Sequence, residues 1–244
     1  MTASQSTAVV IGVGAEAGLG GALCRRLARG GLHVHVAGRT AANLDAVVGT
    51  ITAAGGCATA VPTDTTAESD VVRLFDRAAA AGPLEVVVYN AGNNQFGNFA
   101  EMEAAFFEQV WRVTCLGGFL VGREAARRML PRGAGTILFT GATASIRARP
   151  PFIAFASAKA ALRAIAQGMA REFGPQGLHV AHVIIDGGID GELLRTRAPG
   201  FADAKGDDGL LDIDAIAETY WQLHLQHRTA WTHELDLRPF KEPF

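Results

Sequence analysis

Three glycines near the start of the chain have the spacing of a phosphate-binding turn. Gly14, Gly18 and Gly20 follow the apolar run 8–11 and lead into an amphipathic stretch over 19–31. Glycine lets a backbone turn tightly and approach a diphosphate, while the free N–H groups and the positive dipole end of a following helix attract negative charge. Because these glycines lie between a predicted strand and a predicted helix, we expect them to bind a dinucleotide rather than to form an ordinary turn.

Strands and helices alternate along the rest of the chain. Apolar runs predict strands at 8–11, 32–39, 57–64, 84–92, 136–141, 178–186 and 233–239, with helical patterns between them, including one long helical stretch over about 101–129. This alternation predicts an α/β Rossmann fold, a doubly wound seven-stranded parallel sheet with helices on both faces. Ligands of such sheets bind over the carboxyl ends of the strands.

Length and composition favour one soluble domain. The chain has 244 residues, of which 49% are hydrophobic, and residues 1–244 are predicted to form a single dinucleotide-binding domain. The irregular, charged segment 187–212 is the expected substrate loop of this domain. The formal net charge is −2, and the charged residues form no long run of either sign, so we expect neither nucleic acid nor a membrane as partner. No signal-like or membrane-spanning segment is seen, which predicts a cytoplasmic protein.

The cysteines and histidines suggest no metal site. Cys24, Cys57 and Cys115 are odd in number, widely spaced and set in apolar contexts, so we expect buried free thiols in a reducing compartment. The seven histidines have no spacing that would gather three ligands, and we predict that no metal is bound.

Four features stand at fixed places in this series: the glycine turn, Asp64 after the third strand, Asn90-Ala91-Gly92 after the fourth, and Lys159 in the sequence FASAK. Together they resemble the short-chain dehydrogenase/reductase family over nearly the whole chain. The resemblance implies that Asp64 and Thr65 lie at the adenine and that Lys159 binds the nicotinamide ribose. The expected cofactor-binding residues are Gly14, Gly18, Leu19, Gly20, Arg39, Thr40, Asp64, Thr65, Asn90, Ala91, Gly92, Lys159, Gly187 and Ile189.

The residues after the second strand favour NADP over NAD. An acidic residue there would accept hydrogen bonds from a ribose 2′-hydroxyl, but this chain has Gly38-Arg39-Thr40. Arg39 offers a permanently charged planar group suited to a 2′-phosphate, and Thr40 adds a hydroxyl. Glu16, in the glycine turn, argues mildly against a strongly phosphate-selective pocket.

The chain departs from the family at its proton-transfer residues. The family has a Tyr four residues before the Lys, a Ser thirteen before that Tyr, and an Asn on the preceding helix. Here those positions are Phe155, Ala142 and Thr114. General acid–base catalysis contributes about 10²- to 10⁴-fold, so ketone–alcohol interconversion by the family's route should be severely weakened.

Candidates for replacing the lost groups lie on the loops around the expected site. Thr143 is the best-placed hydroxyl, and the carboxylates of Asp186 and Asp190 are further candidates for moving protons. Arg147 and Arg149 are expected at the substrate opening, where a guanidinium either binds an anionic substrate or is simply solvated. We therefore take Lys159, Thr114, Thr143, Phe155 and Ala142 as the residues of the expected catalytic site.

Two functions remain open. The first is an atypical NADP(H)-dependent oxidoreductase that reduces an activated C=C bond or a carbonyl of a small molecule, with Lys159 and Thr143 or a water molecule stabilising the developing oxyanion. The second is an NADP-binding pseudoenzyme acting as a sensor or scaffold.

The resemblance also implies a homodimer or homotetramer. Ala156, Ala160 and Ala164 lie four apart on the helix of Lys159, where small side chains permit close packing. The end of the chain, 240–244, is expected either to reach a neighbouring subunit or to dock on its own.

Overall fold

The strands form one parallel sheet. The computed structural model describes residues 5–92 and 94–242, and its main sheet has the strand order β3-β2-β1-β4-β5-β6-β9, with every neighbouring pair parallel. The strands are β1 (Thr7–Ile11), β2 (His33–Gly38), β3 (Cys57–Pro62), β4 (Leu84–Tyr89), β5 (Gly135–Thr140), β6 (Leu178–Ile185) and β9 (Glu234–Leu237). The predicted doubly wound seven-stranded sheet is confirmed. Its strand order reverses between β1 and β4, where the ligand crevice of such a fold lies.

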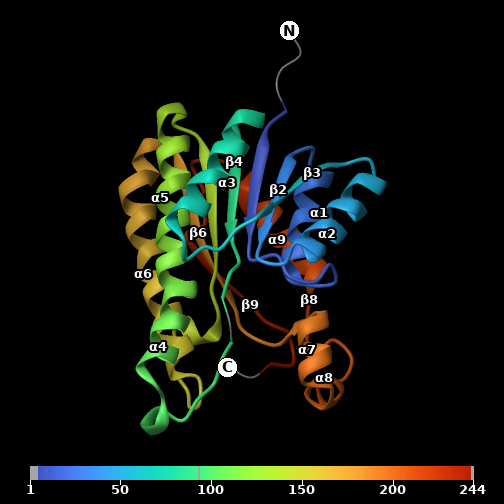
Figure 1. The fold of residues 1–244 in the computed structure, drawn as a ribbon, viewed down its shortest axis with the longest axis vertical. Helices are drawn as coiled ribbons and strands as arrows, with labels where there is room; N and C mark the ends of the chain where they lie inside the picture. The colour runs from blue at the N-terminus through green and yellow to red at the C-terminus, as the bar shows by residue number, and fades with distance from the viewer. Residues whose placement is uncertain (1–4, 93, 243–244) are drawn as a thin grey trace.

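Helices cover both faces of the sheet (Figure 1). On one face lie α1 (Leu19–Arg29), α2 (Ala41–Ala53) and α9 (Ile213–Leu225), and on the other lie α3 (Glu68–Ala81), α5 (Gly117–Met129) and α6 (Ile153–Phe173). Because both faces are covered, β1, β4 and β6 are buried along nearly their whole length, which explains their near-continuous apolar sequences.

The stretch expected as one long helix is interrupted. It contains α4 (Ala104–Trp111), one π-helical turn (Arg112–Leu116) and α5, preceded by a 3₁₀ turn (Phe99–Glu101). A π turn widens a helix locally and is frequent at functional sites. Apolar periodicity cannot detect it, because the five residues of the turn continue the same pattern.

The prediction that 187–212 is irregular is wrong. The segment contains β7 (Ile189–Asp190), α7 (Glu192–Arg197), α8 (Pro199–Lys205) and β8 (Leu211–Asp212), and β7 pairs with β8 in a small second sheet. Figure 1 places α7 and α8 beside the carboxyl ends of the strands. These elements are shorter than the sequence patterns that identify helices and strands, and contacts within the segment hold them.

The end of the chain docks on this segment of its own subunit. Lys205 and Glu242 form an ion pair of 2.5 Å, and Lys241 donates to the carbonyl oxygen of Asp207. Residues 243 and 244 lie outside the described residues. Docking on the same subunit, one of the two alternatives for this end, is therefore present for residues 241 and 242.

One cysteine expectation is also corrected. Cys24 and Cys115 are buried as predicted, but Cys57 is exposed because it begins β3 at the edge of the sheet. Among the residues that the structure describes, no helix has the length and hydropathy of a membrane span, and no group of three possible metal ligands is found.

Candidate active site

The turn between β1 and α1 packs directly on the end of β4. Gly12 has φ +86°, and a Cβ there would come within 2.4 Å of the amide nitrogen of Ala91. Asn90 donates from Nδ2 to the carbonyl oxygen of Gly12 at 3.3 Å. Only glycine fits this conformation and contact, so Gly12 is a residue of the turn that the motif-based prediction missed. Its signal was a further glycine directly after the first strand.

The same turn leaves space where a diphosphate would bind. A Cβ added at Gly14 would meet no atom within 4 Å, whereas one at Gly20 would come within 2.9 Å of Cα of Val13. Helix α1 begins after Gly18, which has no side chain to cap the amides of the first turn, Leu19 and Gly20 among them. An open turn with uncapped helix amides fits the pyrophosphate of a dinucleotide.

The segment 187–212 reaches over this turn. Glu192 donates its backbone N–H to the carbonyl oxygen of Ala17 at 3.0 Å, and Gly191 lies against Ala17 and Gly18. Ile189 pairs with Leu211, and Asp190 forms a two-bonded ion pair with Arg195 in the last turn of α7. Asp190 is therefore engaged in holding this segment together.

Arg39 and Thr40 are exposed at the carboxyl end of β2, as the cofactor prediction requires. Arg39 makes no ion pair within 5–92 or 94–242, so its guanidinium is available to a ligand. Glu16, expected to disfavour a phosphate, instead forms an ion pair with Arg25, which compensates its charge. The electrostatic objection to a 2′-phosphate at this site is thereby weakened.

Asp64 and Thr65 differ in their surroundings. Asp64 is exposed, and its Oδ1 accepts hydrogen bonds from the amide and the hydroxyl of Thr66, which rigidifies the turn before α3. The side chain of Thr65 is buried beside Tyr89 and Gly117, so it faces the core rather than solvent. Asp64 is consequently the side chain of this pair that a ligand can reach.

Lys159 is buried over the centre of the sheet. It is 4% exposed, and its Nζ donates to the carbonyl oxygen of Thr140 at 2.6 Å. Burial lowers the pKa of Lys159 to about 8. Its ammonium also lies 5.7 Å from the ring centroid of Phe155, one helical turn earlier. A lysine whose pKa is close to neutrality can both hold a hydroxyl group and transfer a proton.

A second polar group approaches the same place from the π-helical turn. The Oγ1 of Thr114 is fully buried and has no hydrogen-bond partner among the described residues. A Cβ built on Gly92 would lie 3.2 Å from Nζ of Lys159 and 3.8 Å from this hydroxyl oxygen. Lys159 and Thr114 therefore meet beside Gly92, with an unsatisfied hydroxyl that a ligand or a water molecule would satisfy.

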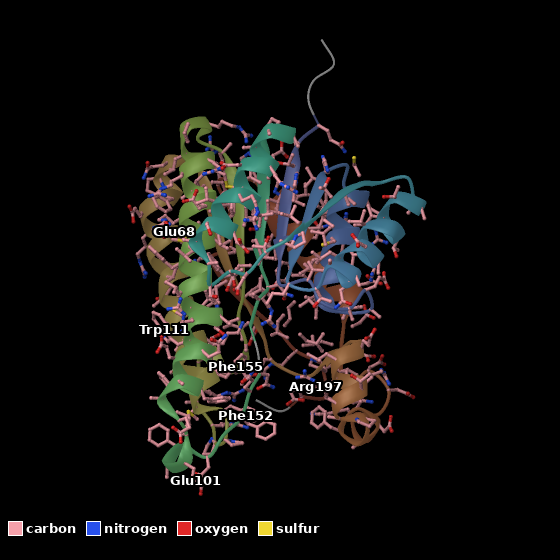
Figure 2. The ribbon with its side chains drawn as sticks, viewed as in Figure 1. Glu68, Glu101, Trp111, Phe152, Phe155 and Arg197 are labelled. Carbon is pink, nitrogen blue, oxygen red and sulfur yellow. The ribbon has the colours of Figure 1, made fainter. Side chains whose placement is uncertain are left out.

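The surface next to this pair, called the apolar wall below, is formed by apolar side chains. Phe155 is 8% exposed and packs with Val110, Ala154 and Ala158, with Ala142 at the edge of the cluster. Figure 2 shows Phe155 on α6 in the lower part of the molecule, at the end where α7 and α8 lie. The side chains at positions 142 and 155 are brought together as predicted, and neither carries a hydroxyl.

Thr143 is committed to another contact. It donates its hydroxyl hydrogen to Oδ1 of Asp186, a residue that is 3% exposed. Arg147 lies 3.3 Å and Arg238 2.5 Å from the same carboxylate. The loop after β5, the end of β6 and the end of β9 are thus joined at one buried carboxylate. Arg238 comes from far along the chain, and no sequence signal could have identified it.

Not every predicted residue joins this group. Arg149 is exposed, while Gly187 lies against Pro239, where a Cβ would come within 2.7 Å of the proline ring.

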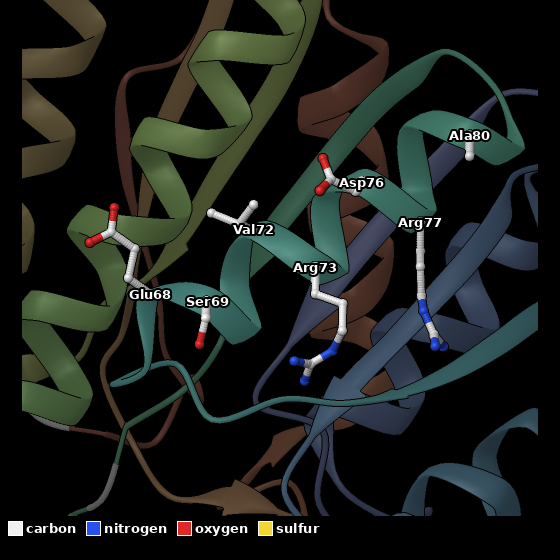
Figure 3. A pocket seen from close by; sticks show the side chains of 7 residues that line it. All are labelled: Glu68, Ser69, Val72, Arg73, Asp76, Arg77 and Ala80. Carbon is white, nitrogen blue, oxygen red and sulfur yellow. The ribbon is translucent and has the colours of Figure 1, made fainter.

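A further pocket, lined by α3 residues from Glu68 to Ala80, belongs to the helix layer (Figure 3). Its residues Glu68 and Asp76 form ion pairs with Arg123 and Arg128 of α5, so its polar groups serve helix packing.

A doubly wound sheet with a glycine turn before its first helix, and a lysine buried over its centre, defines a Rossmann-type nucleotide-binding oxidoreductase. The family model described as "short chain dehydrogenase" matches residues 8–199. The chain therefore belongs to the short-chain dehydrogenase family, and the predicted resemblance is confirmed.

Individual relatives agree with this membership. A short-chain dehydrogenase from Rhodopseudomonas palustris is 39% identical, with a TM-score of 0.83 over 96% of this chain and 99% of that one. Gluconate 5-dehydrogenase from Gluconobacter oxydans is 32% identical over 72% of this chain and 70% of its own length. The uncharacterized oxidoreductase YuxG of Bacillus subtilis is 35% identical over 79% of this chain, but the match spans only 28% of its length.

Proposed function

We propose that this chain is an NADP(H)-dependent oxidoreductase that reduces an activated C=C bond or a carbonyl of a small molecule without a tyrosine proton donor. The observation that carries the proposal is the buried Lys159 beside the unsatisfied hydroxyl of Thr114, facing the apolar wall of Phe155 and Ala142. Positive charge is present at the centre of the site, but the phenol and the serine hydroxyl typical of the family's site are absent.

The residues present fit a nicotinamide dinucleotide. The open turn at Gly14 and the uncapped amides at the start of α1 would hold its pyrophosphate, and Asp64 would lie at its adenine. Lys159 would hold the nicotinamide ribose, as in the family. Arg39 supports NADP over NAD, because an arginine without a carboxylate partner among the described residues complements a 2′-phosphate.

Bound there, the cofactor supplies a hydride. The chain's own residues must then stabilise the negative charge that develops on the substrate oxygen and provide one proton. The ammonium of Lys159 does both: its charge stabilises an enolate or alkoxide, and its lowered pKa eases transfer of a proton from Nζ. Thr114 would orient the proton donor, while Phe155 excludes water from this side of the site. An activated C=C bond suits this arrangement best, because the charge of its enolate is delocalised and the enolate oxygen is a weaker base than the oxygen of the alkoxide formed from a ketone.

NADPH fluorescence titration followed by a panel of enones and ketones tests the proposal. We expect tighter binding of NADPH than of NADH, and oxidation of NADPH with at least one class of enone. Lys159→Met should abolish that oxidation, and Arg149→Ala, on the exposed loop outside the group, is the matched control. Binding of NADPH without its oxidation by any acceptor would overturn the oxidoreductase proposal.

The same apolar wall favours a second candidate, an NADP-binding sensor or scaffold that performs no redox chemistry. An Escherichia coli relative, 33% identical over 78% of this chain, is named a cyclic-di-GMP-binding biofilm dispersal mediator protein. The name of that relative describes binding of a nucleotide rather than a reaction. It therefore supports a role for this chain in which nucleotide binding changes the conformation of the protein. For such a sensor, NADPH binding should change protease susceptibility of 187–212 while leaving every acceptor unreduced.

We also propose a homodimer or homotetramer that buries the outer faces of α5 and α6. Ala160 and Ala164 of α6 lie on its exposed side, and Phe119 of α5 is 44% exposed, whereas Ala156, expected on the same side, is buried within the subunit. Small and aromatic side chains on adjacent exposed helices permit close apolar packing between subunits. Light scattering after size exclusion measures the assembly, and Phe119→Glu should dissociate it. A monomer in the unsubstituted protein would contradict this proposal.

A further inference from the structure

His182 lies one strand in from the edge of the sheet and is not among the residues of the site described above. It occupies β6, is 0% exposed, and places Nδ1 3.0 Å from Oε2 of Glu234. Glu234, at the start of β9, also accepts two hydrogen bonds from the guanidinium of Arg163, at 2.6 and 2.7 Å. The imidazole is therefore held on one side by a carboxylate that is itself fixed by α6.

The other ring nitrogen of His182 is unsatisfied. Nε2 is buried and has no hydrogen-bond partner in the described part of the chain. It lies against Gly141, where a Cβ would come within 2.3 Å of it. A buried polar atom without a partner destabilises the folded state, so a group that donates to Nε2 is expected.

Lys159 contacts the peptide group that joins Thr140 to Gly141, the glycine that lies against the imidazole of His182. Its Nζ donates to the carbonyl oxygen of Thr140, and the next residue is the Gly141 that faces His182. Lys159 and Arg163 are four residues apart on α6, and the positive charges of both lower the pKa of His182. The ammonium of Lys159 and the imidazole of His182 therefore lie close together on one side of β5.

The charges around the ring determine which nitrogen carries its hydrogen. The charged groups facing His182 are Lys159 and Arg163 from α6 and Glu234 from β9, while β5 contributes backbone only. Burial, the largest cause, and the two cations lower the pKa of His182 to about 4, so the ring is neutral near pH 7. A neutral imidazole has one N–H, and a carboxylate only accepts, so Nδ1 carries the hydrogen and Nε2 carries a lone pair.

We propose that His182 is a positioning residue for Lys159: Glu234 fixes its tautomer, and its Nε2 is linked to the ammonium through one water molecule, which accepts a hydrogen bond from Nζ and donates one to Nε2. Gly141 is required because a larger residue would occupy the space of the imidazole. The placement of the ammonium does not depend on the chemistry of the site, and only its catalytic consequence rests on the proposed function.

The composition of the chain allows a direct test. The whole sequence contains three lysines, Lys159, Lys205 and Lys241, so a protein labelled with ¹³C at the lysine ε position gives three titrating NMR signals. Lys159→Met assigns the signal of Lys159. Because a hydrogen bond from the ammonium stabilises its charged form, loss of that bond should lower the pKa of Lys159 by about one pH unit or more.

Three variants separate positioning from packing. His182→Leu should lower the pKa of Lys159, and His182→Gln, which keeps an acceptor near the place of Nε2, should restore it. His179→Leu is the matched control, because His179 is a buried histidine of the same strand that faces the other side of the sheet. An unchanged titration in His182→Leu, or an equal change in His179→Leu, would overturn the proposal.

A measurement on the unsubstituted protein covers the case in which His182→Leu does not fold. ¹⁵N spectra of the histidine rings should show hydrogen on Nδ1 of His182 at pH 7, and Glu234→Gln should release this tautomer and lower the pKa of Lys159. Hydrogen on Nε2 in the unsubstituted protein would refute the proposal. All these experiments use the protein without cofactor, so a failure of NADPH to bind would refute the proposed function and leave this inference standing.

Discussion

Replacing Lys159 by methionine should stabilise the cofactor-free protein at neutral pH. In the folded chain the pKa of Lys159 is about 8, whereas an unfolded chain has the ordinary lysine value of 10.5. The difference corresponds to about 3 kcal/mol disfavouring the buried ammonium, at about 1.4 kcal/mol for each pH unit. Methionine fills a similar volume without charge. The gain is reduced by loss of the hydrogen bond from Nζ to Thr140.

The pH dependence gives the cleaner readout. Between pH 8 and 10.5 the unfolded state binds more protons at Lys159 than the folded state does, so the free energy of unfolding of the unsubstituted protein rises with pH across this window. Lys159→Met lacks this rise, so its stability advantage should be largest below pH 8 and shrink toward pH 10.5. Urea denaturation at four pH values from 7 to 10 measures both proteins.

Parallel stability curves would refute this reasoning, because they would mean that Lys159 titrates alike in both states. Lys241→Met is the control: this lysine is exposed and donates to a backbone carbonyl, so its replacement should leave the pH dependence unchanged. The same Lys159→Met variant should bind NADPH more weakly. A substitution that raises the stability of the protein and weakens ligand binding is expected where a buried charged group serves ligand binding rather than folding.

Three further predictions follow from the site and the buried histidines. Phe155→Tyr combined with Ala142→Ser should raise ketone reduction by about 10²- to 10⁴-fold, and no gain would mean that the pocket does not present carbonyl substrates. Arg39→Glu should weaken NADPH binding by about tenfold or more and leave NADH binding unchanged or improved, as measured by calorimetry. An equal loss of affinity for both cofactors would exclude a contact between Arg39 and the 2′-phosphate. Burial lowers the pKa of both His35 and His182 to about 4, so the free energy of unfolding should fall as the pH falls from 6.5 toward 4. His35→Leu should reduce that loss of stability. A free energy of unfolding that does not change over this pH range in the unsubstituted protein would contradict the prediction.

Sequence reasoning correctly assigned the fold and placed a glycine turn between its first strand and first helix. The continuous apolar runs of β1 and β4 and the glycines after β1 are local features, and each reports a local requirement: burial on both faces, or a backbone that turns without a Cβ. The order of strands and helices then restricts the topology to a doubly wound sheet, because parallel crossovers are right-handed. The same reasoning placed Phe155 and Ala142 together, since it counted along a family pattern.

The helices and strands within segment 187–212 and the charges around the buried side chains could not be predicted from the sequence. The helices α7 and α8 are too short to produce a clear period, and they are held by contacts such as the one from Glu192 to Ala17. Likewise, the carboxylate of Asp186 looked available for proton transfer in the sequence. In the structure it is held by Arg238, a residue brought to it by the pairing of β9 with β6.

The sequence by itself thus determined the order of elements, the glycine turn after the first strand and the residue types at positions 142, 155 and 159, because these depend on residue type and on neighbours along the chain. Only the tertiary structure decided how acidic Lys159 is, which hydroxyl is unsatisfied beside it, and that His182 shares its surroundings with Glu234. Burial and charge act through space, and these partners come from segments that are far apart until the sheet closes.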